Sequence, residues 1–343
     1  SICRVGDTFY LVNSTFEFFP GVPLCTSKNL VNWQLIGHVL DRESQLPLAG
    51  STPSGGIFAP TIRYHDGLFY MITTNVNIMF GSGRTGNFIV HAKDPAGPWS
   101  EPVFVDQFGI DPSLFWDDDG RCYFCGTGHD EAFGGQGIVF FEVNTLTGEI
   151  LSEKEFISHG SGGKCPEGPH IYKKDGWYYL MLAEGGTEYG HMETIARSRD
   201  IRGPYEFRPD GPLLTCRGQS GDCNPIQATG HADLFDDADG NWWVVSLGIR
   251  PTGPMLHHLG RETFLAPVKW MDGWPYMDCG GVMKPVMDGP LPAADTVTPV
   301  SDDIAVDLTA LTDAAQLPKA FSWLREPAME NYRFGPGGLR LCG

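Results

Sequence analysis

Three ionisable residues and one aromatic residue occupy the same position in four similar stretches of this sequence. Each stands twelve residues before an aromatic residue, and the four pairs are Phe58 and Tyr70, Asp111 and Tyr123, Glu167 and Tyr179, and His231 and Trp243. Two carboxyl groups in one pocket support acid–base chemistry, in which one acid donates a proton while another carboxylate activates water. The shared spacing predicts that equivalent elements carry these residues to one place.

The elements that must position them are hairpins. Residues 165–180 read C-P-E-G-P-H-I-Y-K-K-D-G-W-Y-Y-L, in which Asp175-Gly176 separates two runs rich in apolar and aromatic residues. An Asp-Gly pair between two such runs is a strong hairpin signal. The phrase occurs five times, about 53 to 64 residues apart, and the other turns are Gly6-Asp7, Asp66-Gly67, Asp119-Gly120 and Asp239-Gly240.

Self-similarity at a nearly fixed period predicts a blade array, and each interval has room for four short strands. Outer strands are visible in 88–99, F-I-V-H-A-K-D-P-A-G-P-W, and in 194–205, T-I-A-R-S-R-D-I-R-G-P-Y. We therefore expect an all-β fold, a five-bladed β-propeller over residues 1–286. A generic antiparallel sandwich with coincidental Asp-Gly turns is the alternative.

The repeat pattern fades after Trp274. Residues 287–320 are rich in small and acidic residues and in proline, which is typical of a linker. Strand-like patterning returns at Phe321 in a stretch too short to bury a core of its own. We expect residues 287–343 to be a linker and the truncated start of a C-terminal β-sandwich domain.

The composition of the chain limits the kinds of partner that it could bind. The 343 residues carry a formal net charge of −18, which argues against nucleic acid and anionic membrane surfaces as partners, although acidity can serve solubility alone. No run of 18 apolar residues and no signal peptide is visible. The nine cysteines are odd in number and scattered, and Cys122 and Cys125 lie in a strand pattern that sets them on opposite faces. We expect free thiols, a cytoplasmic rather than secreted location, and either a monomer or a homo-oligomer.

In a propeller the innermost strands surround one axial channel, so the four aligned residues should meet there. Paired carboxylates in an aromatic-lined funnel suit glycoside hydrolysis. The phrases that carry a family resemblance are S-T-F-E-F-F-P-G, S-G-G-I-F-A-P-T-I-R-Y, I-D-P-S-L-F, P-E-G-P-H-I-Y, G-H-A-D-L-F and L-G-I-R-P. In order over residues 1–285, the chain resembles glycoside hydrolase family 43, above all its β-xylosidase and α-L-arabinofuranosidase members. That family is similar in fold to the propeller expected here, often followed by a β-sandwich.

The resemblance implies roles for the ionisable residues. Glu167 would be the general acid, and Asp111 would orient it and tune its pKa. His231 would contact a water or a central cation such as calcium, and no other cofactor is implied. As structural alternatives, Glu167 could be a solvated charge, Asp111 a turn cap and His231 a buried histidine bonded to backbone.

The resemblance also implies the sugar-binding residues. Arg250 would bind substrate hydroxyls, or else pair with one of the two carboxylates. Phe16 and Phe58 would be sugar-stacking walls, with ordinary core packing as the alternative, and Thr187 is also assigned to substrate binding. Family members often carry Trp at the position of Phe58. A Phe in place of that Trp would make the pocket less specific.

One family residue has no counterpart in the printed sequence. The family's general base is an Asp in a P-D-P-S-I phrase, and this sequence opens at Ser1-Ile2. Loss of a general base costs about 10²–10⁴-fold in rate. We expect a fragment trimmed at both ends; a non-catalytic carbohydrate-binding propeller is the rival interpretation, and a protein-interaction scaffold is a third.

The function expected from the resemblance is exo-acting hydrolysis with inversion. The substrates would be β-1,4-linked xylo-oligosaccharides, with terminal α-L-arabinofuranose as a second activity. Because xylopyranose and arabinofuranose can present similar hydroxyl patterns to one pocket, the sequence does not separate the two.

Overall fold

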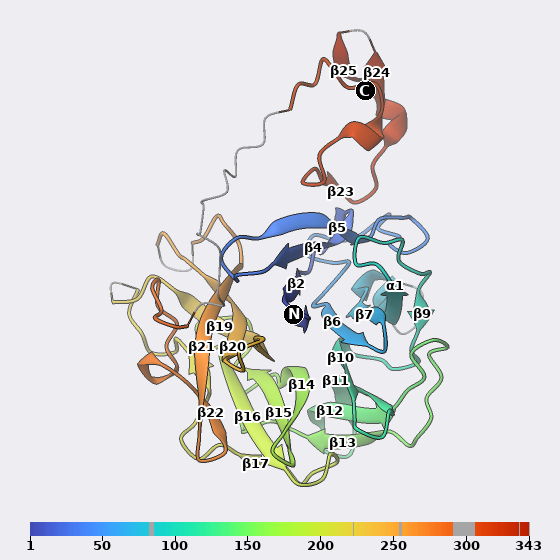
Figure 1. The fold of residues 1–343 in the computed structure, drawn as a ribbon. Coiled ribbons are helices and arrows are strands. Elements are labelled where there is room, and N and C mark those ends of the chain that lie inside the picture. The colour runs from blue at the N-terminus through green and yellow to red at the C-terminus, as the bar shows by residue number, and fades with distance from the viewer. Residues whose placement is uncertain (82–85, 222, 254–255, 291–305, 336, 343) are drawn as a thin grey trace.

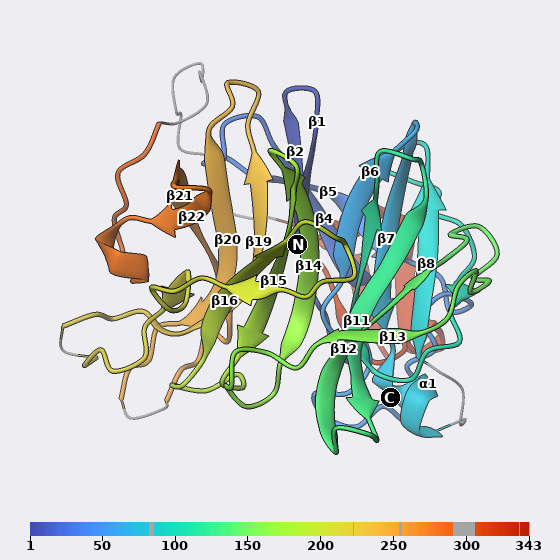
Figure 2. The same ribbon diagram turned by 90° about the horizontal axis from the view of Figure 1, so that it is seen from below.

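Five antiparallel sheets, four with four strands and one with five, surround a central axis, as the ribbon in Figure 1 shows. The computed structural model describes residues 1–343 except 82–85, 222, 254–255, 291–305, 336 and 343. Seen from below in Figure 2, the sheets stand side by side, and the N-terminus lies between them. The fold is the five-bladed β-propeller predicted from the repeats, and the sandwich alternative is wrong for this part of the chain.

The strands of each blade follow one another in the sequence, except that β3 (Phe18–Phe19) lies outside the first blade. The first blade contains β1 (Ile2–Val5), β2 (Thr8–Val12), β4 (Gly21–Ser27) and β5 (Gln34–Leu40). The second contains β6 (Thr61–His65), β7 (Leu68–Thr74), β8 (Asn87–Ala92) and β9 (Val103–Phe104), with α1 (Val76–Gly81) after β7. The third contains β10 (Ile110–Trp116), β11 (Cys122–Asp130), β12 (Gly135–Glu142) and β13 (Glu155–Ser158).

The last two blades continue the same order. The fourth contains β14 (Glu167–Lys174), β15 (Trp177–Glu184), β16 (Met192–Ser198) and β17 (Glu206–Phe207), and β18 (Leu214–Thr215) also pairs with β16. The fifth contains β19 (Gln227–Asp236), β20 (Trp242–Ile249), β21 (Glu262–Met271) and β22 (Trp274–Met277), followed by the 3₁₀ turn η1 (Cys279–Gly281).

The five predicted turns join the first and second strands of the five blades. Asp66-Gly67 and Asp175-Gly176 both have positive φ at each residue (47° and 80°, 52° and 73°). Type I′ turns need this backbone, which Asp and Gly tolerate, and the turn twist matches that of the flanking strands. The repeated Asp-Gly signal therefore marks the turn between the first and second strands of a blade.

Aromatic and aliphatic side chains between neighbouring blades form the core. The aligned aromatics are almost fully buried, with Tyr123 and Tyr179 each 1% exposed. Cys122 and Cys125 face opposite sides of β11 and pack in different apolar clusters, as their spacing predicts. All nine cysteines, which lie within the described ranges, have free thiols.

The ring closes without a strand shared between its first and last blades. The rings of Phe9 and Phe235 pack edge to face at 5.6 Å, and Arg4 pairs with Asp236 at 3.1 Å. Burial of apolar area rather than the partly exposed ion pair stabilises this seam.

In Figure 1 the part around β23 of the segment after residue 305 lies next to the first blade, and β24 and β25 lie farther from the propeller. It contains η2 (Ala314–Gln316), β23 (Trp323–Leu324), η3 (Met329–Asn331), β24 (Tyr332–Gly335) and β25 (Gly338–Leu341). β23 pairs with β3 (Phe18–Phe19), and β24 pairs with β25. Residues 291–305 of the predicted linker lie outside the described residues, and a domain boundary at 286 and a sandwich start stay predictions.

Candidate active site

Backbone irregularities at the start of three inner strands turn the aligned side chains toward the axis. The register of β10 shifts between Ile110 and Ser113, and that of β14 and β19 shifts at the equivalent places. Asp111 and His231 have φ of 54° and 50°, and Gly168, beside Glu167, has φ of 57°. Left-handed backbone at a non-glycine residue is uncommon, and bulges of this kind re-aim side chains beside active sites.

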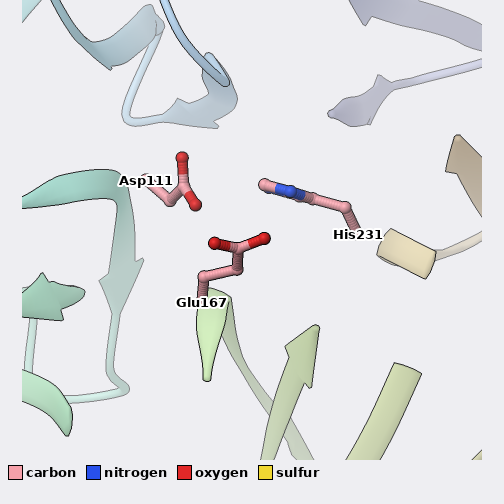
Figure 3. A group of neighbouring side chains, drawn as sticks. All are labelled: Asp111, Glu167 and His231. Carbon is pink, nitrogen blue, oxygen red and sulfur yellow. The ribbon is translucent and has the colours of Figure 1, made fainter. Parts of the chain in front are cut away.

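The three re-aimed side chains meet. In Figure 3 the carboxyl groups of Asp111 and Glu167 face each other, and the ring of His231 points toward both from the opposite side. One ligand atom from each lies within 4.8 Å of the others. They line a cavity of about 540 Å³. The sequence alignment therefore placed these residues correctly in space.

The other predicted residues divide into two groups. Phe16, Phe58 and Thr187 line the same cavity, and the two phenylalanine rings pack edge to face at 5.9 Å. Arg250 does not line it, among the residues that the structure describes. Its guanidinium is held by Glu262 at 2.9 Å, and its side chain is 52% exposed. The expectation that Arg250 sits beside the acid is wrong in this structure.

Arg261 takes the place expected for Arg250. It lines the cavity, lies over the ring of Phe16 at 5.0 Å, and its positive charge lowers the pKa of both Asp111 and Glu167. Arg250 and Arg261 stand at the two ends of the connection between β20 and β21. The folded conformation of that connection determines which of the two side chains points into the cavity. The L-G-I-R-P phrase pointed to the wrong one, and no motif marks R-E-T-F at Arg261.

Burial sets the protonation of the carboxyl pair. Burial raises the pKa of Asp111 to about 7, although the hydrogen bond from the Gly168 backbone amide and the charge of Arg261 both act to lower it. Burial also raises the pKa of Glu167, to about 8, and the negative charge of Asp111 acts in the same direction while Arg261 opposes it. Two carboxyl groups this close do not ionise together easily. The pair therefore holds a proton near neutral pH.

His231 is kept neutral. Burial and, to a smaller extent, the charge of the nearby Arg261 lower its pKa to about 3. Its ring rests on Gly168, where a Cβ would come within 2.7 Å of Nε2. A neutral imidazole can offer one donor and one acceptor to a bound molecule.

A buried ion pair that the sequence did not predict borders the cavity through Asp233. Arg63 from β6 contacts Asp233 from β19 at 2.9 Å, and the Asp233 side chain is 2% exposed. The Tyr172 hydroxyl donates to Asp233 at 2.6 Å, and Arg63 lies 3.0 Å from Nδ1 of His170. Burial opposes ionisation of Asp233, but the charges of Arg63, His170 and the Ser1 amine and the hydrogen bond from Arg63 together outweigh it and lower the pKa of the carboxyl group. Asp233 and His170 thus bring a charged, hydrogen-bonded network to the wall of the cavity.

The cluster does not fit a directly bound calcium ion. Calcium takes six to eight oxygen ligands. The three residues offer one imidazole nitrogen and two carboxyl groups that favour protonation, and the cation Arg261 acts on both carboxyl groups. A hydrated cation held by His231 through water stays a prediction, and no chemical step is assigned to it.

Comparison with known proteins agrees with this geometry. The profile of the glycosyl hydrolases family 43 matches residues 1–275. This chain belongs to glycoside hydrolase family 43. The family-43 chain is 46% identical over 349 residues to the non-reducing end alpha-L-arabinofuranosidase BoGH43B of Bacteroides ovatus, covering 100% of this chain and 62% of that protein.

Two further proteins are also similar to this chain. The family-43 chain is 50% identical to a xylosidase/arabinosidase of Butyrivibrio fibrisolvens, over 82% of this chain and 54% of that protein. The crystal structure of a xylan beta-1,4-xylosidase from Bacillus halodurans superposes with a TM-score of 0.91 at 38% identity, over 99% of this chain and 66% of that one. The chain thus spans about half to two thirds of the length of these relatives.

Among the described residues, no helix is long and apolar enough to cross a membrane.

Proposed function

We propose that the protein is an exo-acting glycosidase in which Glu167 protonates the departing glycosidic oxygen. The observation that carries this is the raised pKa of Glu167 in a cavity that it shares with Asp111. A general acid must be protonated at working pH, and burial beside a like charge achieves this for a glutamate. Asp111 orients the acid and raises its pKa.

The charged wall of the pocket supports exo action. Asp233, held by Arg63, lines the pocket that contains the acid pair. We propose that this ion pair keeps a sugar chain from passing along the axis, so that the chain ends in the pocket. Phe16 and Phe58 offer apolar faces to the terminal sugar ring. Arg261 offers a planar set of donors that suits neighbouring hydroxyl groups.

The substrates proposed are β-1,4-linked xylo-oligosaccharides and terminal α-L-arabinofuranose. The names of the relatives support them, since one is an arabinofuranosidase and another a xylosidase/arabinosidase. These names do not separate the two sugars for this chain.

An inverting reaction needs a carboxylate about 6.5–9.5 Å from the acid to activate water. In the described part of the chain, the cavity has four carboxyl groups, those of Asp111, Glu167, Asp233 and Glu262. The first two form the acid pair, and the other two are paired with arginines. None is placed as a free general base.

The start of β1 supports a candidate for the base. Ser1 lines the cavity, and its nitrogen donates to the carbonyl of Val12 at 3.1 Å. A residue attached to that nitrogen would enter the pocket next to the acid pair. We propose that an Asp there is the base, as the family resemblance implies. If no such residue exists in the whole protein, the non-catalytic binding propeller becomes the better interpretation.

Hydrolysis of aryl β-xyloside and aryl α-L-arabinofuranoside tests the proposal. The printed chain is compared with one extended ahead of Ser1, and the anomer first released is read by NMR. We expect activity with inversion in the extended chain and about 10²–10⁴-fold less in the printed one. A covalent glycosyl-enzyme, or hydrolysis of the corresponding disaccharide that survives Glu167→Ala, contradicts the mechanism.

A further inference from the structure

Glu184 is a fully buried carboxylate that the proposed chemistry does not use. It ends β15, is 0% exposed, and accepts three hydrogen bonds. Oε1 accepts from the backbone N–H of Ser161 at 2.8 Å and from the hydroxyl of Thr194 at 2.7 Å. Oε2 accepts from the backbone N–H of Gly163 at 2.7 Å. The two backbone N–H groups can only donate, so Glu184 accepts a hydrogen bond at each of its oxygens.

Two of these partners lie in the segment that delivers Glu167. Residues 159–166 connect β13 to β14, and Glu167 is the first residue of β14. The segment is pressed against Glu184, since a Cβ on Gly160 or Gly163 would come within 2.9 Å or 2.7 Å of its Oε2. The backbone of the acid's own loop therefore rests on a carboxylate at the end of the next strand.

Glu184 also directly precedes a second loop that borders the pocket. Residues 185–191 follow it and include Thr187, which lines the cavity. The Gly185 N–H donates to the carbonyl of Lys164 at 2.7 Å, and the Lys164 ammonium pairs with Glu188 at 2.6 Å. The two loops are thus joined to each other next to Glu184.

We propose that Glu184 is a positioning residue that fixes the loop before Glu167 and so aims the acid at the leaving oxygen. Charged hydrogen bonds to backbone amides are strong, and supporting contacts of this kind hold a reacting group to within a fraction of an ångström. A displacement of about 1 Å at a reacting group costs about 10²-fold in rate. The inference rests on the proposed role of Glu167.

The test is Glu184→Gln in the full-length protein, because Gln keeps the shape but presents an NH₂ group to a backbone donor. Two glycosides of the sugar that the wild type accepts are compared, a disaccharide and a dinitrophenyl glycoside. The disaccharide needs a proton on its leaving oxygen, whereas dinitrophenolate departs without one. Glu167→Gln is measured beside it as the reference for a lost acid.

We expect kcat for the disaccharide to fall about 10- to 100-fold in Glu184→Gln while kcat for the dinitrophenyl glycoside falls less than about 3-fold. A merely structural role lowers the folded fraction and reduces both substrates by the same factor. Equal losses, or no loss on either substrate, overturn the inference. If Glu167→Gln itself shows no difference between the substrates, the proposed function fails instead.

Gly163→Ala carries the same test if Glu184→Gln does not fold, since its Cβ would push the loop away from Oε2. We expect the same split between the two substrates, and equal losses count against the inference. Gly190→Ala is the matched control in the neighbouring loop. Its Cβ would meet only the Gly185 carbonyl at 3.6 Å, an ordinary contact, so both substrates should keep their rates.

Discussion

The imidazole of His231 lies on the bare backbone of Gly168, the residue directly after Glu167. A Cβ on Gly168 would come within 2.7 Å of Nε2, and its φ of 57° disfavours any side chain. A glycine here allows the fourth and fifth blades to bring the acid and the histidine together.

Gly168→Ala should therefore lower stability and activity together. The strained backbone and the contact with His231 should cost about 1–3 kcal/mol of unfolding free energy, measured by urea denaturation. Gly37→Ala is the control, because its Cβ would meet nothing within 4 Å and its φ is not positive. Equal stability of the two variants would show that the ring can move aside freely.

Asp111→Asn should shift the alkaline limb of the pH–rate profile to lower pH. Glu167 must be protonated to act, so kcat/KM should fall as pH rises through its pKa of about 8. Removing the negative charge of Asp111 makes ionisation of Glu167 easier and lowers that pKa. The profile of the residual activity measures the shift, and a limb that stays in place or moves upward would contradict the electrostatic role of Asp111.

Arg261→Gln should shift the alkaline limb of the pH–rate profile to higher pH. Its positive charge favours the ionised form of Glu167, so its loss should raise the pKa of the acid. Arg250→Gln is the matched control, since Arg250 pairs with Glu262 and does not line the cavity. A shift with Arg250→Gln and none with Arg261→Gln would restore the assignment made from the sequence.

Breaking the ion pair between Arg63 and Asp233 should destabilise the whole ring. Arg63→Met leaves Asp233 charged and 2% exposed, which should cost about 3–5 kcal/mol in chemical denaturation. The double variant with Asp233→Asn should be less destabilised than the sum of the two single variants, because no uncompensated charge is left. Additive losses would mean that the two side chains do not depend on each other.

The repeat made the fold predictable from the sequence. Each Asp-Gly turn and its buried aromatic are set by local backbone and burial preferences, so they mark the inner hairpin of every blade. The same register brought Asp111, Glu167 and His231 to one cavity, because equivalent positions of a closed ring face one axis.

Residues outside that register could not be predicted. Arg250 and Arg261 both border one long connection, and which of them turns inward depends on packing against Phe16 and pairing with Glu262. The contact of Arg63 with Asp233 joins residues 170 positions apart. Glu184 is recognised only from the loop that rests on it. Contacts between blades depend on the closed ring, which no local pattern encodes.

The role of Glu167 as the acid is tested most directly by Glu167→Gln in the full-length protein. The measurement is kcat/KM for the disaccharide divided by kcat/KM for the dinitrophenyl glycoside, relative to wild type. Proton donation by Glu167 predicts that this ratio falls by about 10²-fold or more, because only the disaccharide needs the proton. An unchanged ratio, whatever the absolute rates, would mean that another group protonates the leaving oxygen.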